Sequence, residues 1–208
     1  MKNNLFKFVL CFAVTISFIT SSSYGLSTSI VTSEKELEPQ WVKNAYIYPL
    51  QPSMPEWKKY TTDELRMTCF LPPETIKEMT TQELIVSVIY FPYFIDFWAF
   101  ENIYHAKEIF KIKSNALEEM LERPNILNSL NDVFNSSWAK NKAKEKLPNL
   151  TNLEEVIAAL TAIMIEENKE KQWDDFDNWL LKFTEWYVLN AQNPEDNILI
   201  YTLNKYFN

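Results

Sequence analysis

The sequence contains a single glycine, Gly25, and it lies close to the N-terminus. A phosphate-binding P-loop, a dinucleotide fingerprint, a nucleophile elbow and an EF-hand loop all need glycine at fixed positions. The backbone there must adopt a positive φ or approach a ligand closely. The sequence therefore excludes these sites. Tight two-residue β-hairpins also depend on glycine, so a protein built mainly of β-sheet is not expected.

Histidine and cysteine are almost as scarce. His105 is the only histidine, which excludes zinc motifs with two histidines and the paired Glu-x-x-His pattern of di-iron proteins. Of the two cysteines, Cys11 lies in an N-terminal apolar stretch. Cys69 has apolar neighbours, which is typical of a small buried side chain rather than a reactive thiol.

Residues 1–25 have the pattern of an export signal. A positively charged start is followed by an apolar stretch over 8–19, and small residues stand at Ser23 and Gly25. We expect cleavage after Gly25, so that the exported chain begins at Leu26 and is secreted or held in a periplasm or at the cell surface. An uncleaved N-terminal anchor is the alternative. No later segment is apolar enough to span a bilayer.

The chain is acidic, with a formal net charge of −8 that becomes −10 once the two lysines of the signal are removed. An acidic protein repels the phosphate backbone of nucleic acids. Nucleic acid is therefore not an expected partner.

The remaining sequence predicts an all-α single domain of about seven or eight helices. Residues 26–55 contain several prolines and are expected to form an extended arm that packs its aromatic residues on the body. Residues 56–135 form the first helical region, and the C-terminal helices of 136–208 pack on it. Within that last region, the lysine-rich stretch 136–148 is the best candidate for a linker.

Capping boxes and apolar periodicity place the helices. Thr80-x-x-Glu83, Asn115-x-x-Glu118 and Thr151-x-x-Glu154 each precede an apolar run at helical spacing. A long helix is predicted over 95–113, and a last helix over 195–206.

The stretch from Trp57 to Phe134 resembles a family of uncharacterised bacterial exported domains. The residues that carry the resemblance are Trp57, Thr62, Glu64, Cys69, Leu71-Pro72, Met79-Thr80-Thr81, Leu84, Phe91-Pro92, Asp96, Ala99-Phe100 and the run Asn115-Ala116-Leu117-Glu118-Glu119-Met120-Leu121-Glu122-Arg123. The sequence departs from the pattern at Tyr90, where asparagine is expected, and at Ala116, where glycine is expected. The resemblance implies bacterial export and helices, and it supplies no catalytic residue.

Glu101, His105 and Glu108 are spaced so that they share one helical face and form the sharpest metal-site candidate. The apolar residues of this stretch point nearly the opposite way, so a solvated outer face is the favoured interpretation.

An acidic cluster of Asp174, Asp175 and Asp177 lies beside Trp173 and Trp179. It is a candidate calcium site or a sugar-binding acid pair with stacking aromatics. Acidic residues are also favoured at a helix N-terminus, and this structural role is the preferred one.

Four polar positions belong to the family-like pattern: Asp96, Asn115, Glu119 and Arg123. Glu119 and Arg123 are spaced as an i, i+4 ion pair, and Asn115 is interpreted as a helix N-cap. A shared ligand pocket is the alternative.

Residues 90–100 are dense in aromatic side chains, and these cannot all face one core if the segment is an α-helix. Core packing is favoured, but this segment is also the best candidate surface for a protein or peptide partner.

We therefore assign no catalytic, cofactor-binding or metal-binding residue and expect no cofactor. The leading hypothesis is an exported, non-enzymatic helical module that binds a protein or peptide. One alternative is a carboxylate-based hydrolase acting on glycan or cell-wall material with two acids among Glu101, Glu119, Asp174 and Asp177. Another is a purely structural domain, which would show neither a cleft nor an exposed apolar patch.

Overall fold

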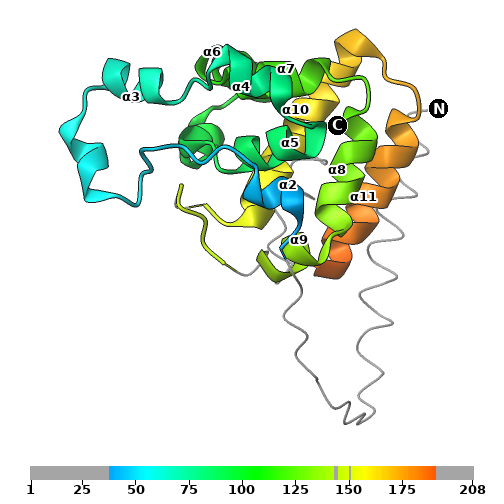
Figure 1. Cartoon of the computed structure of the whole chain (residues 1–208). Helices are drawn as coiled ribbons and strands as arrows, with labels where there is room; N and C mark the ends of the chain where they lie inside the picture. Colours follow the sequence, from blue (N-terminus) through cyan, green and yellow to red (C-terminus); the bar gives the residue numbers. More distant parts are fainter. Residues whose placement is uncertain (1–37, 143–144, 150, 191–208) are drawn as a thin grey trace, which may run out of the picture.

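The computed structural model describes residues 38–142, 145–149 and 151–190, and within them it confirms the all-α fold. The only β-type pairing there is an isolated bridge between Lys146 and Asn152. The elements, shown in Figure 1, are α2 (Gln40–Lys43), η2 (Pro55–Lys59), α3 (Thr62–Thr68), α4 (Pro73–Glu78), α5 (Thr81–Ile89), η3 (Pro92–Ala99), α6 (Ile103–Lys113), α7 (Asn115–Glu122), α8 (Ile126–Asn135), α9 (Ser137–Lys142), α10 (Leu153–Lys171) and α11 (Phe176–Asn190).

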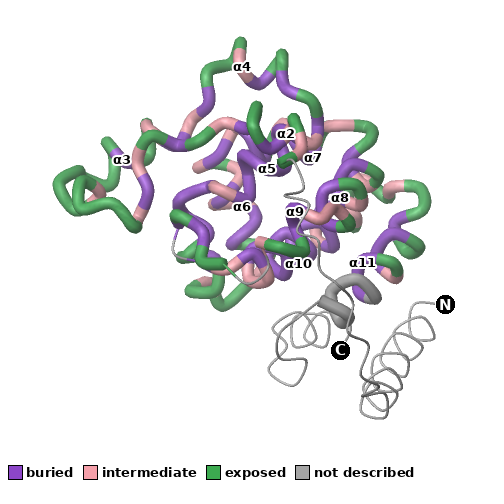
Figure 2. The backbone as a smooth tube through the Cα atoms, turned by 60° about the horizontal axis from the view of Figure 1, so that its bottom comes forward, coloured by how far each residue is buried: buried purple, intermediate pink, exposed green. Residues whose placement is uncertain are grey.

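Two helices form the centre of the protein. Every residue of α5 except Gln82 is buried, and α10 is buried along most of its first thirteen residues. Helices α2, α7, α8 and α10 pack around α5, while α6 packs on α10 (Figure 2). From Leu84 to Ile89 the helix is apolar on nearly all sides, with Ser87 as the one polar residue, so this part of α5 requires a surrounding shell. None of the helices among the described residues is long and apolar enough to cross a membrane.

The segment before the centre packs on α5 as an irregular stretch that also contains the short helix α2. Asn44 donates a hydrogen bond to the Glu83 carboxylate at 2.8 Å, and the Tyr46 amide donates to the Ser87 hydroxyl at 2.7 Å. Tyr48 is only 1% exposed. Residues 26–37 and the predicted signal lie outside the described residues.

Several predicted helix boundaries were wrong. The helix predicted over 95–113 is interrupted: residues 92–99 form a 3₁₀-helix, and α6 begins only after Asn102, whose side chain caps the amide of Tyr104 at 2.8 Å. Asn115 is not an N-cap, because the Ser114 hydroxyl caps α7 instead.

The predictions for the C-terminal region also needed correction. The capping box of α10 is Asn152 with Glu155, one residue later than predicted, because the Thr151 side chain bonds to Asn149 instead. The linker expected over 136–148 contains α9, whose Trp138 is buried and meets the Trp41 ring edge-on at 5.7 Å. The helix predicted over 195–206 lies outside the described residues.

Three of the described helices, α4, α5 and α7, receive side-chain donors from distant segments at their C-termini. The last carbonyl groups of a helix lack partners within the helix, and glycine in a left-handed conformation commonly helps to satisfy them. At the end of α5, the Asn149 amide donates to the carbonyls of Ile89 (3.1 Å) and Phe91 (2.9 Å), and the Gln51 amide donates to that of Tyr90 (3.1 Å).

The same arrangement recurs at two more helix ends. Arg123 donates to the carbonyl of Ile76 in the last turn of α4 at 3.0 Å. Lys171 donates to the carbonyl of Leu121 near the end of α7, also at 3.0 Å. Each such bond joins two segments that are far apart in the sequence, so closing a helix end also fixes tertiary structure.

Replacing the buried amide at the end of α5 should destabilise the whole domain. Asn149→Ala removes the side-chain donor of the Ile89 carbonyl, whereas the Phe91 carbonyl keeps the amide of Phe94 at 3.2 Å. We expect a loss of about 2 kcal/mol in the free energy of unfolding. Urea denaturation of the variant and the wild type measures this loss.

The matched control is Asn135→Ala, because Asn135 donates a single exposed hydrogen bond to the carbonyl of Asn131. It should cost less than about 0.5 kcal/mol. Equal losses for the two variants would contradict the role assigned to Asn149.

Candidate functional site

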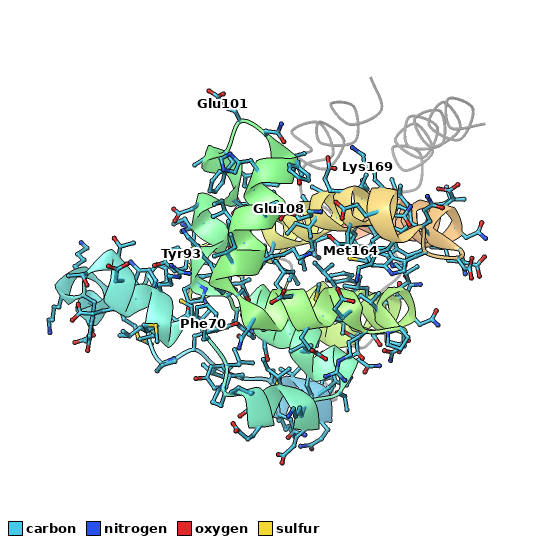
Figure 3. The ribbon with its side chains drawn as sticks, turned by 90° about the horizontal axis from the view of Figure 1, so that it is seen from above. Phe70, Tyr93, Glu101, Glu108, Met164 and Lys169 are labelled. Atoms are coloured by element: carbon cyan, nitrogen blue, oxygen red, sulfur yellow. The ribbon has the colours of Figure 1, made fainter. Side chains whose placement is uncertain are left out.

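The metal-site candidate of α6 lies on the outer surface. Glu101 and His105 are exposed, and Glu101 stands at the tip of the loop before α6 in Figure 3. His105 meets the Phe100 ring edge-on at 5.9 Å, and Glu108 forms an ion pair with Lys107 at 3.3 Å. Within the described residues, no group of three metal-ligating side chains comes together.

The polar residues of the family-like pattern hold the fold together. Asn115 forms two hydrogen bonds with the backbone of Leu71, accepting from its amide at 2.9 Å and donating to its carbonyl at 2.8 Å. Glu119 and Arg123 form the predicted ion pair, 2.9 Å apart. Asp96 is exposed on η3, so these residues do not converge on a shared pocket.

The aromatic segment 90–100 is mainly core, and a 3₁₀-helix explains how. With three residues per turn, side chains at i and i+3 lie one above the other. The phenylalanines occur at this spacing, and all of them contact the buried ring of Phe110 with centroids 5.3–6.3 Å away: Phe91, Phe94, Phe97 and Phe100. Repetition every three residues was the sequence signal for this element.

An adjacent edge of η3 remains accessible. Ile95 and Trp98 are again three residues apart, and they are 44% and 36% exposed. Of the aromatic segment that the sequence suggested as a partner surface, these are the two large apolar side chains left at the surface.

A groove lies between α8 and α11, which run side by side (Figure 1). Its volume is about 390 Å³, within the usual range for ligand sites. Its walls come from the loop before α8, from α8 itself, and from the start of α11. The lining residues are Pro124, Asn125, Ile126, Leu127, Asn128, Asn131, Trp173, Asp174, Asp175, Asn178, Trp179 and Lys182.

The groove carries side-chain amides on both walls. Asn128 and Asn131 are three residues apart on α8, and Asn178 lies on α11. Among the described residues, the amide groups of Asn128 and Asn131 have no side-chain hydrogen bond, whereas Asn125 is engaged by Thr81 at 2.8 Å. An amide offers a donor and an acceptor side by side, so free amides suit a ligand that presents both.

One end of the groove is acidic. Asp174 and Asp175 both line it and are exposed, whereas Asp177 does not line it. Asp175 has a left-handed backbone with φ 59°, and its carboxylate accepts from the amide of Asn178 at 3.4 Å. Of the acids suggested for a hydrolase, Asp174 lines the groove, while Glu101 and Glu119 do not. The structure therefore does not assemble that set.

The tryptophans of the groove belong to an aromatic stack along α11. Trp173, Phe176, Trp179 and Phe183 follow one another with centroid separations of 5.2–6.0 Å and interplanar angles of 18–33°. Trp179 is 3% exposed, and its indole N–H has no acceptor among the described residues.

A buried ion cluster between α6 and α10 was missed by the sequence analysis. Lys107 is 1% exposed and lies 3.0 Å from Glu167, which is 2% exposed. Glu167 also approaches Lys111 at 3.4 Å and Lys171 at 3.8 Å, and Glu170 approaches Lys107 at 3.2 Å. The sequence did contain an indication of this cluster, because Lys107 lies within the apolar face of α6, one turn before Phe110.

The cluster holds both central groups in their charged forms. Burial alone would lower the pKa of Lys107, but its contacts with Glu167, Glu170 and Glu108 outweigh burial, and the pKa is raised. Burial alone would raise the pKa of Glu167, but its contacts with Lys107 and Lys111 outweigh burial, and the pKa is lowered. A lysine held so firmly protonated is no nucleophile, so the cluster joins α6 to α10.

Neutralising the buried carboxylate should weaken the fold in a pH-dependent way. Glu167→Gln leaves Lys107 without its buried counter-charge, and we expect a loss of about 3 kcal/mol at pH 7. Because the folded pKa of Glu167 lies below the ordinary value of 4.5, its stabilisation is complete above that pH and is lost as the pH falls through the folded pKa. The difference in the free energy of unfolding between the wild type and the variant should therefore become smaller as the pH is lowered.

Urea denaturation between pH 7 and about 3 measures this difference. Glu145→Gln is the control, because Glu145 is 58% exposed and pairs with Lys142 at the surface. It should cost less than about 1 kcal/mol throughout. If the loss of stability in Glu167→Gln is the same at every pH, the ion pair of Glu167 with Lys107 is not what stabilises the fold.

Comparisons with known proteins add no relative of established function. No family model, no curated protein and no solved structure matches this chain. The resemblance of residues 57–134 therefore depends on the residues quoted for it, and the function has to be argued from the chain itself.

Proposed function

We propose that this protein is a non-enzymatic helical module that binds a protein or peptide partner, and that the groove between α8 and α11 holds an extended segment of that partner. The observation that carries the proposal is the groove itself, which places side-chain amides on two facing helices. Those of Asn128 and Asn131 on α8 form no side-chain hydrogen bond among the described residues, and that of Asn178 on α11 donates to Asp175. An extended peptide presents backbone N–H and C=O groups along its length, and an amide side chain can pair with both.

The aromatic stack favours a peptide over a sugar. A sugar ring needs an open aromatic face, but Trp179 is stacked between Phe176 and Phe183 and is 3% exposed. Trp173 is half-buried and packs on Phe176. The glycan hydrolase remains the second candidate, because Asp174 and Asp175 line the same groove as these tryptophans.

Removing the amides should weaken peptide binding without unfolding the protein. A phage-displayed library of random hexapeptides, selected on the full chain, should yield peptides that shift the side-chain amide NMR signals of Asn128, Asn131 and Asn178. The triple variant Asn128→Ala, Asn131→Ala, Asn178→Ala should bind these peptides about tenfold more weakly or worse, because it loses three neutral hydrogen-bonding groups.

Asn135→Ala is the control, since Asn135 lies on α8 but does not line the groove. Equal binding by the triple variant and the wild type would refute the proposed site. If selection gives no peptide while chitin or peptidoglycan oligosaccharides shift the same signals, the glycan candidate replaces this one.

Export belongs to the same proposal, and its support is the signal-like pattern of residues 1–25. Expression in a bacterium with a general secretion pathway should deliver a chain whose first residue is Leu26 outside the cytoplasm. Mass spectrometry of the exported protein measures that terminus. A chain that keeps residues 1–25 in the soluble cytoplasmic fraction would contradict export.

A further inference from the structure

The interface between α6 and α10 contains a buried positive charge. Among the side chains that the structure describes, Lys107 is the only lysine or arginine that is buried. Its ammonium group lies 3.0 Å from Glu167, 3.2 Å from Glu170 and 3.3 Å from Glu108, and 5.2 Å from the ring of Tyr104. Three carboxylates therefore compensate a charge that water does not reach.

Two more lysines and one more carboxylate belong to the same ion cluster. Glu167 is approached by Lys111 at 3.4 Å and by Lys171 at 3.8 Å, and Lys171 pairs with Glu122 of α7 at 2.7 Å. The 3₁₀-helix η3 also packs on α10, and its Asp96 is exposed. Three lysines thus face four glutamates at neutral pH, and protonation of the glutamates would leave only the three positive charges.

Helix α6 depends on this cluster more than α8 depends on any ion pair. Only three residues of α6 are buried, and one of them is Lys107 itself, beside Ala106 and Phe110. The buried residues of α8 are all uncharged, and they are Ile126, Ser129, Leu130, Val133 and Phe134. A loss of charge compensation should therefore loosen α6 and leave α8 packed.

Acid removes the compensation but leaves the buried cation. Burial opposes ionisation of both groups, yet their contacts lower the pKa of Glu167 below the ordinary 4.5 and raise the pKa of Lys107. The stabilisation from Glu167 is lost as the pH falls through its folded pKa, while Lys107 stays protonated. A buried charge without a partner is strongly destabilising, and moving α6 away from α10 lets water reach it.

The other buried carboxylate among the described residues responds differently. Glu83 of α5 accepts hydrogen bonds from the backbone amide of Thr80 and from the side-chain amide of Asn44. Both donors are neutral, so protonation of Glu83 leaves no buried cation behind. The strongest effect of acid on packing is therefore expected between α6 and α10.

We propose that the ion cluster is an acid-sensitive latch: in acid, α6 separates from α10 before the rest of the domain unfolds. Phe110 is carried by α6, so the separation withdraws it from the phenylalanines of η3. Their rings then become accessible on the element that already exposes Ile95 and Trp98. The latch is independent of the groove between α8 and α11.

Amide hydrogen exchange of the full chain, read by mass spectrometry, tests the latch in the wild type. After correction for the intrinsic effect of pH on exchange, protection of α6 should fall about tenfold or more relative to α8 between pH 7 and about 3.5, because the separated state takes up more protons. Equal losses of protection in α6 and α8, or no loss in α6, would overturn the proposal.

Paired variants separate the latch from the general effect of acid. Lys107→Met with Glu167→Met replaces the central ions by apolar side chains of similar length, an exchange that buried ion pairs commonly tolerate. Protection of α6 relative to α8 should then no longer depend on pH. The control is Lys142→Met with Glu145→Met, which removes an ion pair at the surface and should keep the response of the wild type.

A single variant keeps the test decisive if the apolar pair fails to fold. Lys107→Met removes the buried cation, while Glu167 keeps Lys111 and Lys171 as partners. It should lose most of the acid response of α6. An acid response that persists without Lys107, or that disappears in the surface control, would refute the latch.

Discussion

Closing helix ends without glycine is the constraint on which the rest of this structure depends. An all-α protein has many C-termini, and each one exposes carbonyl groups that need donors. No glycine occurs after Gly25, and three of the described helices receive side-chain donors from elsewhere, while α10 ends at Gln172 in a left-handed conformation. Asn149 closes α5, Arg123 closes α4 and Lys171 closes α7. Each donor belongs to a segment remote in sequence, so local helix termination and global packing form together. Breaking any one of these hydrogen bonds would expose the carbonyl groups of a helix end and separate the two segments that the bond joins.

The buried centre combines apolar packing with one paired charge cluster. Helix α5 has almost no solvent face, and the phenylalanines of η3 gather around Phe110. Between α6 and α10, Lys107 and Glu167 replace apolar contacts with an ion pair from which water is excluded. A buried ion pair contributes little more to the free energy of unfolding than apolar residues of the same size would. Removing one of its two charges is strongly destabilising, because the other charge is then buried without a partner. The pair therefore fixes how α6 lies on α10.

The groove is a consequence of how α8 and α11 meet. Their inner faces pack through Phe134 and Phe183, with ring centroids 5.4 Å apart, while polar residues line the recess beside this contact. Neighbouring aromatic rings pack on one another along α11, and the Phe134–Phe183 contact joins the two helices beside the groove. The side-chain amides of the groove are thus carried by two helices that pack on each other.

The sequence by itself determined the fold class, because a composition with a single glycine and the helical apolar periodicity leave few alternatives to packed helices. It also determined features that depend on neighbouring residues, such as the capping box of Thr80 with Glu83 and the ion pair of Glu119 with Arg123. The repetition of phenylalanine every three residues over 91–100 is visible in the sequence too. Only the structure shows that these side chains share Phe110 as their common partner. Only the tertiary structure decided that Asn149 caps α5, that Lys107 meets Glu167 and that α8 lies beside α11. These contacts join residues far apart in the sequence: Asn149 lies 60 positions from Ile89, and Phe134 of α8 meets Phe183 of α11. No local sequence pattern specifies which distant donor or charge will contact a given residue.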